Sequence, residues 1–211
     1  MKRTIEALNC FVLISLLLID LAVVGYGQGP PPPPPPAKDY FPALWKDFTS
    51  AEGAFKVRYP GDPKETSKSY DSGGNTVVLH SFSYGSERFV FYSVDYRDLP
   101  NAPASPSEVK RILNSTRENR LMGLEGKMKV RSENETTRDG HPALYLELEY
   151  LQTKRLRELD VINGRRHYTI LVITFSHHVA MESENSYEKI ATSFLDSFHV
   201  IEKAPSPGND R

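Results

Sequence analysis

An aspartate and a histidine on neighbouring predicted strands have the residue types and spacing that come nearest to acid–base chemistry. Asn163-Gly164 is the strongest hairpin signal in the chain, and a turn on these two residues places Asp160 opposite His167. A carboxylate beside an imidazole can orient the ring for proton transfer. No serine or threonine sits in a nucleophile-elbow motif. We therefore interpret the pair as an exposed cross-strand ion pair, which contributes about 1 kcal/mol or less, with catalysis as the alternative.

His177 and His178 are candidate metal ligands, because imidazole is a common ligand of zinc. Adjacent residues of an extended segment point to opposite sides, so two such rings rarely bind one ion. A site would need a further ligand, such as Glu182 or Glu184. We interpret the two histidines as part of a polar loop, and we predict neither a metal site nor a cofactor.

Basic residues concentrate in the hairpin that carries Asp160 and His167. On the expected pairing, Arg155, Arg157 and Arg166 share one face, and Tyr168 lies on it as well. Arginine beside an aromatic ring is typical of interface anchors, so these four residues are the candidate partner surface. The alternative is that long basic side chains cover apolar sheet surface. The formal net charge of −1 argues against a nucleic-acid partner.

Strand patterns dominate the middle of the chain. Alternating apolar residues and β-branched or aromatic runs, separated by turns rich in Gly, Pro, Asn and Asp, predict a series of strands. The expected strands cover residues 54–59, 64–70, 76–84, 88–96, 127–138, 144–149, 155–162 and 165–175. The strand at 88–96 is apolar on both faces, which predicts a central position with cover on both sides.

Two segments predict helices. Ser105 as N-cap, Pro106 at the first helical position and Glu108 three residues after the cap form a capping box, and this helix is expected to end near Gly123. Residues 182–198 have apolar side chains at helical spacing, and a short strand follows. This order of elements predicts an α+β fold with a mainly antiparallel sheet flanked by two helices.

The N-terminal segment predicts export. A charged start precedes the apolar block 11–24, and Gly25 and Gly27 supply small side chains, so residues 1–27 are interpreted as a signal peptide. The block is shorter than the about 20 residues that a membrane span needs. An uncleaved anchor is the alternative. Cleavage removes Cys10, the only cysteine, so the mature chain would have no disulfide and no thiolate metal site.

The remaining boundaries follow from composition. Residues 28–40 are a proline-rich spacer, in which the run 30–36 is expected to extend over roughly 20 Å. Residues 41–202 are expected to form the folded domain, and residues 203–211 a disordered tail.

Two segments of the predicted domain resemble an exported bacterial family with the PsbP/DcrB-like fold. Residues 48–64, FTSAEGAFKVRYPGDPK, are similar to the family's opening of serine, glycine, aromatic strand and Pro-Gly-x-Pro turn. Residues 194–200, FLDSFHV, are similar to its closing helix-to-strand element. The resemblance implies an α/β/α sandwich and a binding or accessory role without a shared catalytic motif. It identifies no functional residue.

These observations together predict a non-enzymatic binding or accessory domain that acts in the periplasm, at the cell surface or outside the cell. Its expected partner is an envelope protein or complex of unknown identity. Contact with a membrane is expected only if the signal segment remains as an anchor. The alternative function is a small-molecule or lipid carrier with a cavity between the sheet and the helices.

Overall fold

The computed structural model describes residues 42–85, 90–122, 127–151, 154–175 and 184–202. The signal peptide, the proline-rich spacer, the tail and His177 with His178 lie outside these residues, so their predictions stay predictions. None of the helices in the described residues is long and apolar enough to span a membrane.

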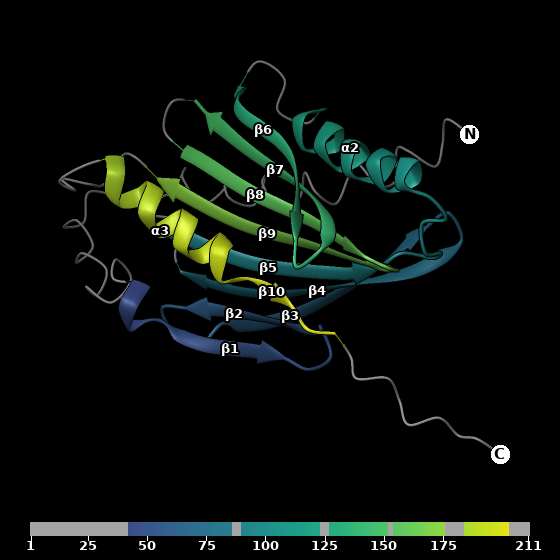
Figure 1. Ribbon diagram of the computed structural model, residues 1–211, viewed down its shortest axis with the longest axis horizontal. Coiled ribbons are helices and arrows are strands. Elements are labelled where there is room, and N and C mark those ends of the chain that lie inside the picture. Colours follow the sequence, from purple (N-terminus) through teal and green to yellow (C-terminus); the bar gives the residue numbers. More distant parts are fainter. Residues whose placement is uncertain (1–41, 86–89, 123–126, 152–153, 176–183, 203–211) are drawn as a thin grey trace, which may run out of the picture.

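Most of the described chain forms two antiparallel sheets (Figure 1). The large sheet has seven strands in the order β3-β4-β5-β9-β8-β7-β6, and the small sheet has three in the order β1-β2-β10. The large-sheet strands are β3 (Lys64–Ser72), β4 (Asn75–Gly85), β5 (Val90–Asp98), β6 (Met128–Arg138), β7 (His141–Tyr150), β8 (Lys154–Asn163) and β9 (Arg166–Phe175). The small-sheet strands are β1 (Lys46–Ser50), β2 (Phe55–Tyr59) and β10 (His199–Val200).

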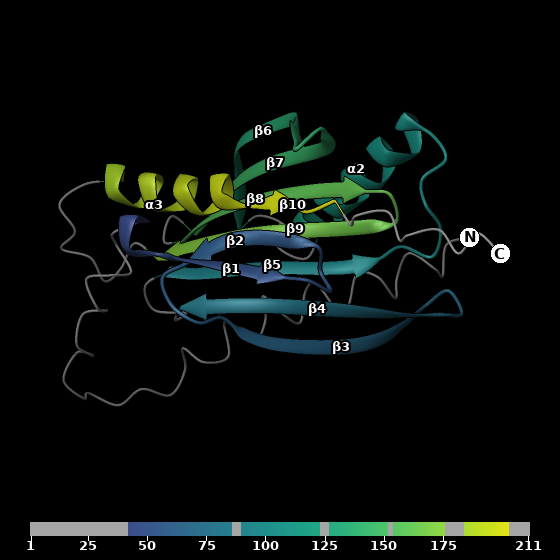
Figure 2. The same cartoon turned by 60° about the horizontal axis from the view of Figure 1, so that its bottom comes forward.

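Two α-helices accompany the sheets, α2 (Pro106–Met122) and α3 (Glu184–Ser197), together with the short 3₁₀ turn η2 (Pro42–Leu44). The small sheet and α3 pack on one face of the large sheet, whereas α2 packs on the other face. Figure 2 shows β3 and β4 at one edge of the large sheet, away from α3.

The expected fold class is therefore wrong. We predicted an α+β domain with a single sheet flanked by two helices, as in an α/β/α sandwich, but the described chain is mostly strand and contains two sheets. The difference arises because Lys46–Ser50, for which we predicted no strand, pairs with β2 along its whole length. β10 pairs with the other edge of β2. A second sheet thus takes part of the face that helices alone were expected to cover.

An aromatic core fills the space between the large sheet, the small sheet and α3. Phe194 of α3 contacts the rings of Tyr59 and Tyr92 at centroid distances of 5.1 and 5.0 Å, and Phe55 of β2 stacks on Phe198 at 5.8 Å. These residues are buried. Tyr168 of β9 donates from its hydroxyl to the Gly53 carbonyl at 2.8 Å. Ring packing and this hydrogen bond together attach the small sheet to the large one.

Strand β5 lies between β4 and β9, so its predicted central position is confirmed, but its second face carries Ser93, Asp95 and Arg97. The predicted N-cap of α2 forms, but the reciprocal bond from Glu108 goes to the residue before the cap. Ser105 Oγ accepts from the Glu108 amide at 3.3 Å, and the Glu108 carboxylate accepts from the Ala104 amide at 2.8 Å. The helix ends at Met122.

The β8–β9 hairpin has its turn one residue later than predicted. Asn163 pairs with Arg166, so Gly164 and Arg165 form the turn, and Gly164 has a φ of 56°. The pairing predicted between Asp160 and His167 is therefore wrong, because Asp160 lies opposite Thr169. Moving the turn by one residue changes each partner by two positions, so every side chain keeps its predicted face.

We expect Phe194→Ala to lower the free energy of unfolding by about 3–5 kcal/mol, because it removes a ring from the fully buried aromatic core. Urea denaturation of the variant and the wild type measures this change. Leu44→Ala is the matched control, since Leu44 is 62% exposed and its truncation should change stability by less than about 0.5 kcal/mol. Equal effects of the two substitutions would contradict the assignment of the core.

Candidate functional site

A cluster of charged and polar side chains lies on the α2 side of the large sheet. Strand alternation places them there: Glu158 and Asp160 of β8 point toward this side, whereas Leu159 and Val161 belong to the aromatic core. The same alternation in β5 and β9 adds the side chains of Asp95, Arg97, His167 and Thr169.

Helix α2 contributes Arg120 to this cluster. Arg120 is buried, and its Nη2 atom lies 2.6 Å from Oε2 of Glu158, which is only 2% exposed. Removing two charges from water is costly unless they neutralise each other. This contact joins α2 to the sheet, and both side chains are closed to water.

His167 and Asp160 do come together, although through a diagonal contact. His167 Nε2 lies 2.9 Å from Asp160 Oδ1, and His167 Nδ1 lies 3.2 Å from Nη2 of Arg97. Because arginine can only donate, Nδ1 is the acceptor, and Nε2 carries the proton that is donated to Asp160. Burial lowers the pKa of His167 to about 3, and the positive charge of Arg97 adds to this effect.

The prediction of an exposed ion pair between Asp160 and His167 is therefore wrong. Both side chains are buried, at 3% exposure for His167 and 1% for Asp160, and the ring is neutral near pH 7. Asp160 Oδ1 also accepts from the Thr169 hydroxyl at 2.7 Å. The contact is a hydrogen bond within a dry network and not a surface charge pair.

Three carboxyl groups of the cluster hold protons more tightly than usual. Burial raises the pKa of Glu158 to about 8, and Asp160, which hydrogen-bonds to Glu158, raises it further. Burial also raises the pKa values of Asp160 and Asp95. The Arg120 guanidinium opposes the shift of the Glu158 pKa, because its positive charge stabilises the ionised carboxylate.

This geometry leaves little opportunity for catalysis. A general base must reach a substrate proton with a free lone pair, but both ring nitrogens of His167 are occupied by neighbours. Arg97 is the member of the cluster that lines a surface pocket of about 180 Å³ beside α2, where it donates to the Tyr70 hydroxyl at 3.1 Å. A molecule entering that pocket meets a guanidinium and not the imidazole.

Within the described ranges, no group of three or more His, Cys, Asp or Glu side chains is arranged to hold a metal ion. His177 and His178 lie outside those ranges.

The four residues of the candidate partner surface lie on one face but do not form one patch. Arg157 and Tyr168 are buried, at 3% and 0% exposure, and Arg157 lies 3.2 Å from Glu147. Arg155 and Arg166 are half-buried. Arg155 of β8 pairs with Thr174 near one end of β9, whereas Arg166 begins β9, so roughly 26 Å of strand separates the two arginines. Direct contact with a partner would have to go through these two arginines separately.

Sequence reasoning missed Asp95, Arg97 and Arg120 as members of the cluster. A signal was present in β5, where the polar residues Ser93, Asp95 and Arg97 alternate with the apolar residues Tyr92, Val94 and Tyr96. A carboxylate on the second face of a central strand needs a buried partner, and this requirement was the available clue. The partner on α2 could not be identified from spacing.

We expect the wild type to lose stability between pH 6.5 and 8, and Glu158→Gln to lose less. The folded state keeps the Glu158 proton up to about pH 8, whereas the unfolded state releases it near 4.5, so raising the pH in this window favours unfolding. His167 is neutral in both states above its ordinary pKa of 6.5 and contributes little there. Urea unfolding of both proteins at pH 6.5 and 8 tests this, and identical pH slopes would contradict it.

We also expect His167 to remain neutral down to a pH of about 3, with its proton on Nε2. Long-range ¹H–¹⁵N NMR spectra of the ring report both the tautomer and its titration. Because the unfolded chain binds this proton below about pH 6.5, His167 stabilises the fold above that pH and loses its contribution as the pH falls. Protonation of the folded ring at pH 6, or a proton on Nδ1, would refute the network.

No family model matches the chain, and no curated protein matches it. Among solved structures, it is similar to the solution structure of cyanobacterial PsbP (CyanoP) from Synechocystis sp. PCC 6803, with a TM-score of 0.51 and 13% sequence identity. That match covers 84% of this chain and 98% of the other.

It is also similar to a protein of unknown function, PA94 from Pseudomonas aeruginosa, with 11% identity over 78% of this chain and 99% of that one. The TM-score of 0.33 is too low to support a conclusion about fold. The likeness to cyanobacterial PsbP supports a PsbP-like fold, the coarser part of the resemblance seen in the sequence. It does not identify an exported DcrB-like family.

Proposed function

We propose that this chain is a non-catalytic accessory domain that binds a partner protein after export to the cell envelope. The observation that carries the proposal is the closure of the acid–base cluster under α2. His167, Asp160 and Glu158 are each less than 4% exposed, and the imidazole is held between Asp160 and Arg97. Such an arrangement stabilises a fold, whereas a catalytic group must meet its substrate.

The PsbP-like fold agrees with the accessory role that the sequence resemblance implies. The basic, proline-rich and apolar features of residues 1–40 motivate the proposed route of export and the spacing of the domain from the envelope. Export, the spacing of the domain and the partner protein are all parts of this proposal.

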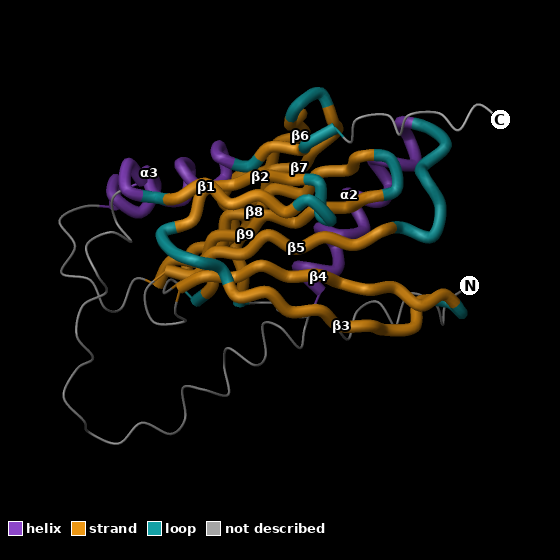
Figure 3. The backbone as a smooth tube through the Cα atoms, turned by 90° about the horizontal axis from the view of Figure 1, so that it is seen from below, coloured by secondary structure: helices purple, strands orange, loops and turns teal. Residues whose placement is uncertain are grey.

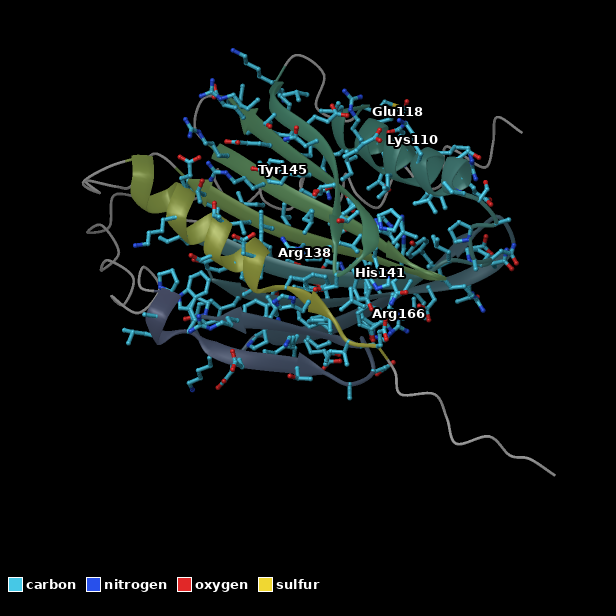
Figure 4. The ribbon with its side chains drawn as sticks, in the orientation of Figure 1. Lys110, Glu118, Arg138, His141, Tyr145 and Arg166 are labelled. Atoms are coloured by element: carbon cyan, nitrogen blue, oxygen red, sulfur yellow. The ribbon has the colours of Figure 1, made fainter. Side chains whose placement is uncertain are left out.

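The edges of the large sheet support a binding role. β3 and β6 each have a neighbour on one side only within the described sheet, and most of the residues of β6 are exposed. An unpaired strand edge is a template on which a partner's strand can add. Lys110 and Arg117 of α2 form ion pairs with Glu135 and Glu133 of β6, at 2.6 and 2.8 Å, and thereby hold this edge against the helix (Figure 4 labels Lys110).

The carrier alternative has less support. Its cavity was expected between the sheet and the helices, but aromatic side chains fill the interface with α3. On the α2 side, Leu113 packs with Leu144 and Ile162, and the charged cluster occupies the neighbouring area.

Site-specific photo-crosslinking in the native host tests the accessory role. A photoreactive residue is placed in the full-length chain at Lys68 on β3, Lys129 on β6, Arg155 on β8 or Glu188 on α3. We expect one partner protein to be captured from adjoining positions and not from the others, because a specific interface covers about 10% of a small protein's surface.

Capture without positional preference would contradict a specific partner. Substrate turnover by the purified chain that is lost in His167→Gln but kept in Lys129→Gln would overturn the non-catalytic assignment.

A further inference from the structure

A polar pocket of about 390 Å³ lies where β4, β5 and β9 meet the turn between β1 and β2. Its side chains from β5 and β9 lie on the small-sheet side of the large sheet, opposite the buried cluster under α2. Figure 3 views the molecule from below, with β4 and β5 lying between β3 and the remaining strands of the large sheet. The volume falls in the range of small-molecule sites.

Tyr96 is the buried side chain of this pocket whose hydrogen bonding is incomplete. It is 3% exposed, and its hydroxyl has no hydrogen-bond partner among the described residues. The ring is held firmly: His80 stacks on it at 4.6 Å, and the Arg166 guanidinium lies 4.7 Å from its centroid. Burial raises the pKa of Tyr96 to about 12, so the hydroxyl remains a donor. A buried donor without an acceptor is costly, and a ligand oxygen would satisfy it.

Arg166 has its charge matched within the protein. Its Nε and Nη2 atoms donate to the two carboxylate oxygens of Asp98 at 2.8 and 3.0 Å, and Nη1 donates to the Glu52 carbonyl at 2.6 Å. This fork fixes the wall of the pocket (Figure 4 labels Arg166). The Arg166–Asp98 pair therefore adds rigidity and no net charge.

Apart from the Arg166–Asp98 pair, the pocket has two charged side chains of opposite sign, Arg165 and Glu52. Arg165 lines the pocket, and no described carboxylate lies within ion-pair distance of it; its Nε donates to the Leu99 carbonyl at 2.9 Å, which orients the side chain. The Glu52 carboxylate is 73% exposed and lies 4.0 Å from His80. The pocket thus presents one cation, one anion, an unsatisfied hydroxyl donor and the apolar surface of Val78, which is 37% exposed.

We infer that this pocket binds a small zwitterion of the free α-amino acid class. Arg165 pairs with the ligand carboxylate, Glu52 pairs with the ammonium group, and the Tyr96 hydroxyl donates to a ligand oxygen. The aliphatic part of the ligand packs against Val78. This inference goes beyond the proposed accessory role and does not depend on a partner protein.

Isothermal titration calorimetry of the full-length chain with the set of free L-amino acids tests the ligand class. We expect saturable one-to-one binding of at least one aliphatic member. Its matched analogues that retain only the carboxylate or only the ammonium group (for leucine, 4-methylpentanoate and isopentylamine) should bind at least about tenfold more weakly, because each lacks one charge-assisted contact. No saturable binding up to about 10 mM, or equal binding of either analogue, overturns the inference.

Three variants test the assignment of residues. Arg165→Gln and Glu52→Gln should each weaken binding by about tenfold, since each removes one charge from an exposed position. Tyr96→Phe should weaken binding several-fold without lowering the urea midpoint, because its hydroxyl makes no hydrogen bond in the free protein. Lys129→Gln on β6 is the control and should bind as the wild type does. Unchanged affinity in both Arg165→Gln and Glu52→Gln refutes the site even if an amino acid binds.

Discussion

The buried contact between Arg120 and Glu158 is the constraint on which the arrangement of the α2 side depends. Leu113 and Arg120 are the buried residues of the helix, so apolar contact alone attaches it weakly. A guanidinium in a dry interface requires carboxyl groups around it. Glu158 and Asp160 of β8 supply these carboxyl groups, and Glu158 lies 2.6 Å from Arg120.

The two faces of the large sheet consequently have different roles. The face toward α3 and the small sheet contains interlocked aromatic rings and accounts for most of the apolar burial. The face toward α2 combines two apolar clusters with a network of hydrogen-bonded charges. Beside the edge formed by β3 and β4, polar side chains line an open pocket. We therefore expect a ligand to bind in this pocket. His167 and Asp160, the residue types that could act in catalysis, are buried inside the fold.

The β8–β9 hairpin illustrates how far prediction from sequence could go. The Asn163-Gly164 signal identified the hairpin and the faces of its side chains, because a displaced turn keeps the parity of strand pairing. It could not give the exact partner of Asp160, since Asn163 itself joins the ladder and Arg165 enters the turn. Nor could it show that Asp160 and His167 are dry. Burial at these positions comes from α2, which lies more than thirty residues earlier in the chain.

The sequence by itself determined the positions of most strands, the N-cap and extent of α2, and the central position of β5. Alternation, turn chemistry and capping act over a few neighbouring residues, so they can be recognised without the tertiary structure. Only the tertiary structure decided that Lys46–Ser50 starts a second sheet, that Arg120 reaches Glu158, and that Tyr96 borders a pocket with Arg165 and Glu52. These outcomes depend on pairing and burial between distant segments. No local pattern specifies which strand edge is filled or which polar group is removed from water.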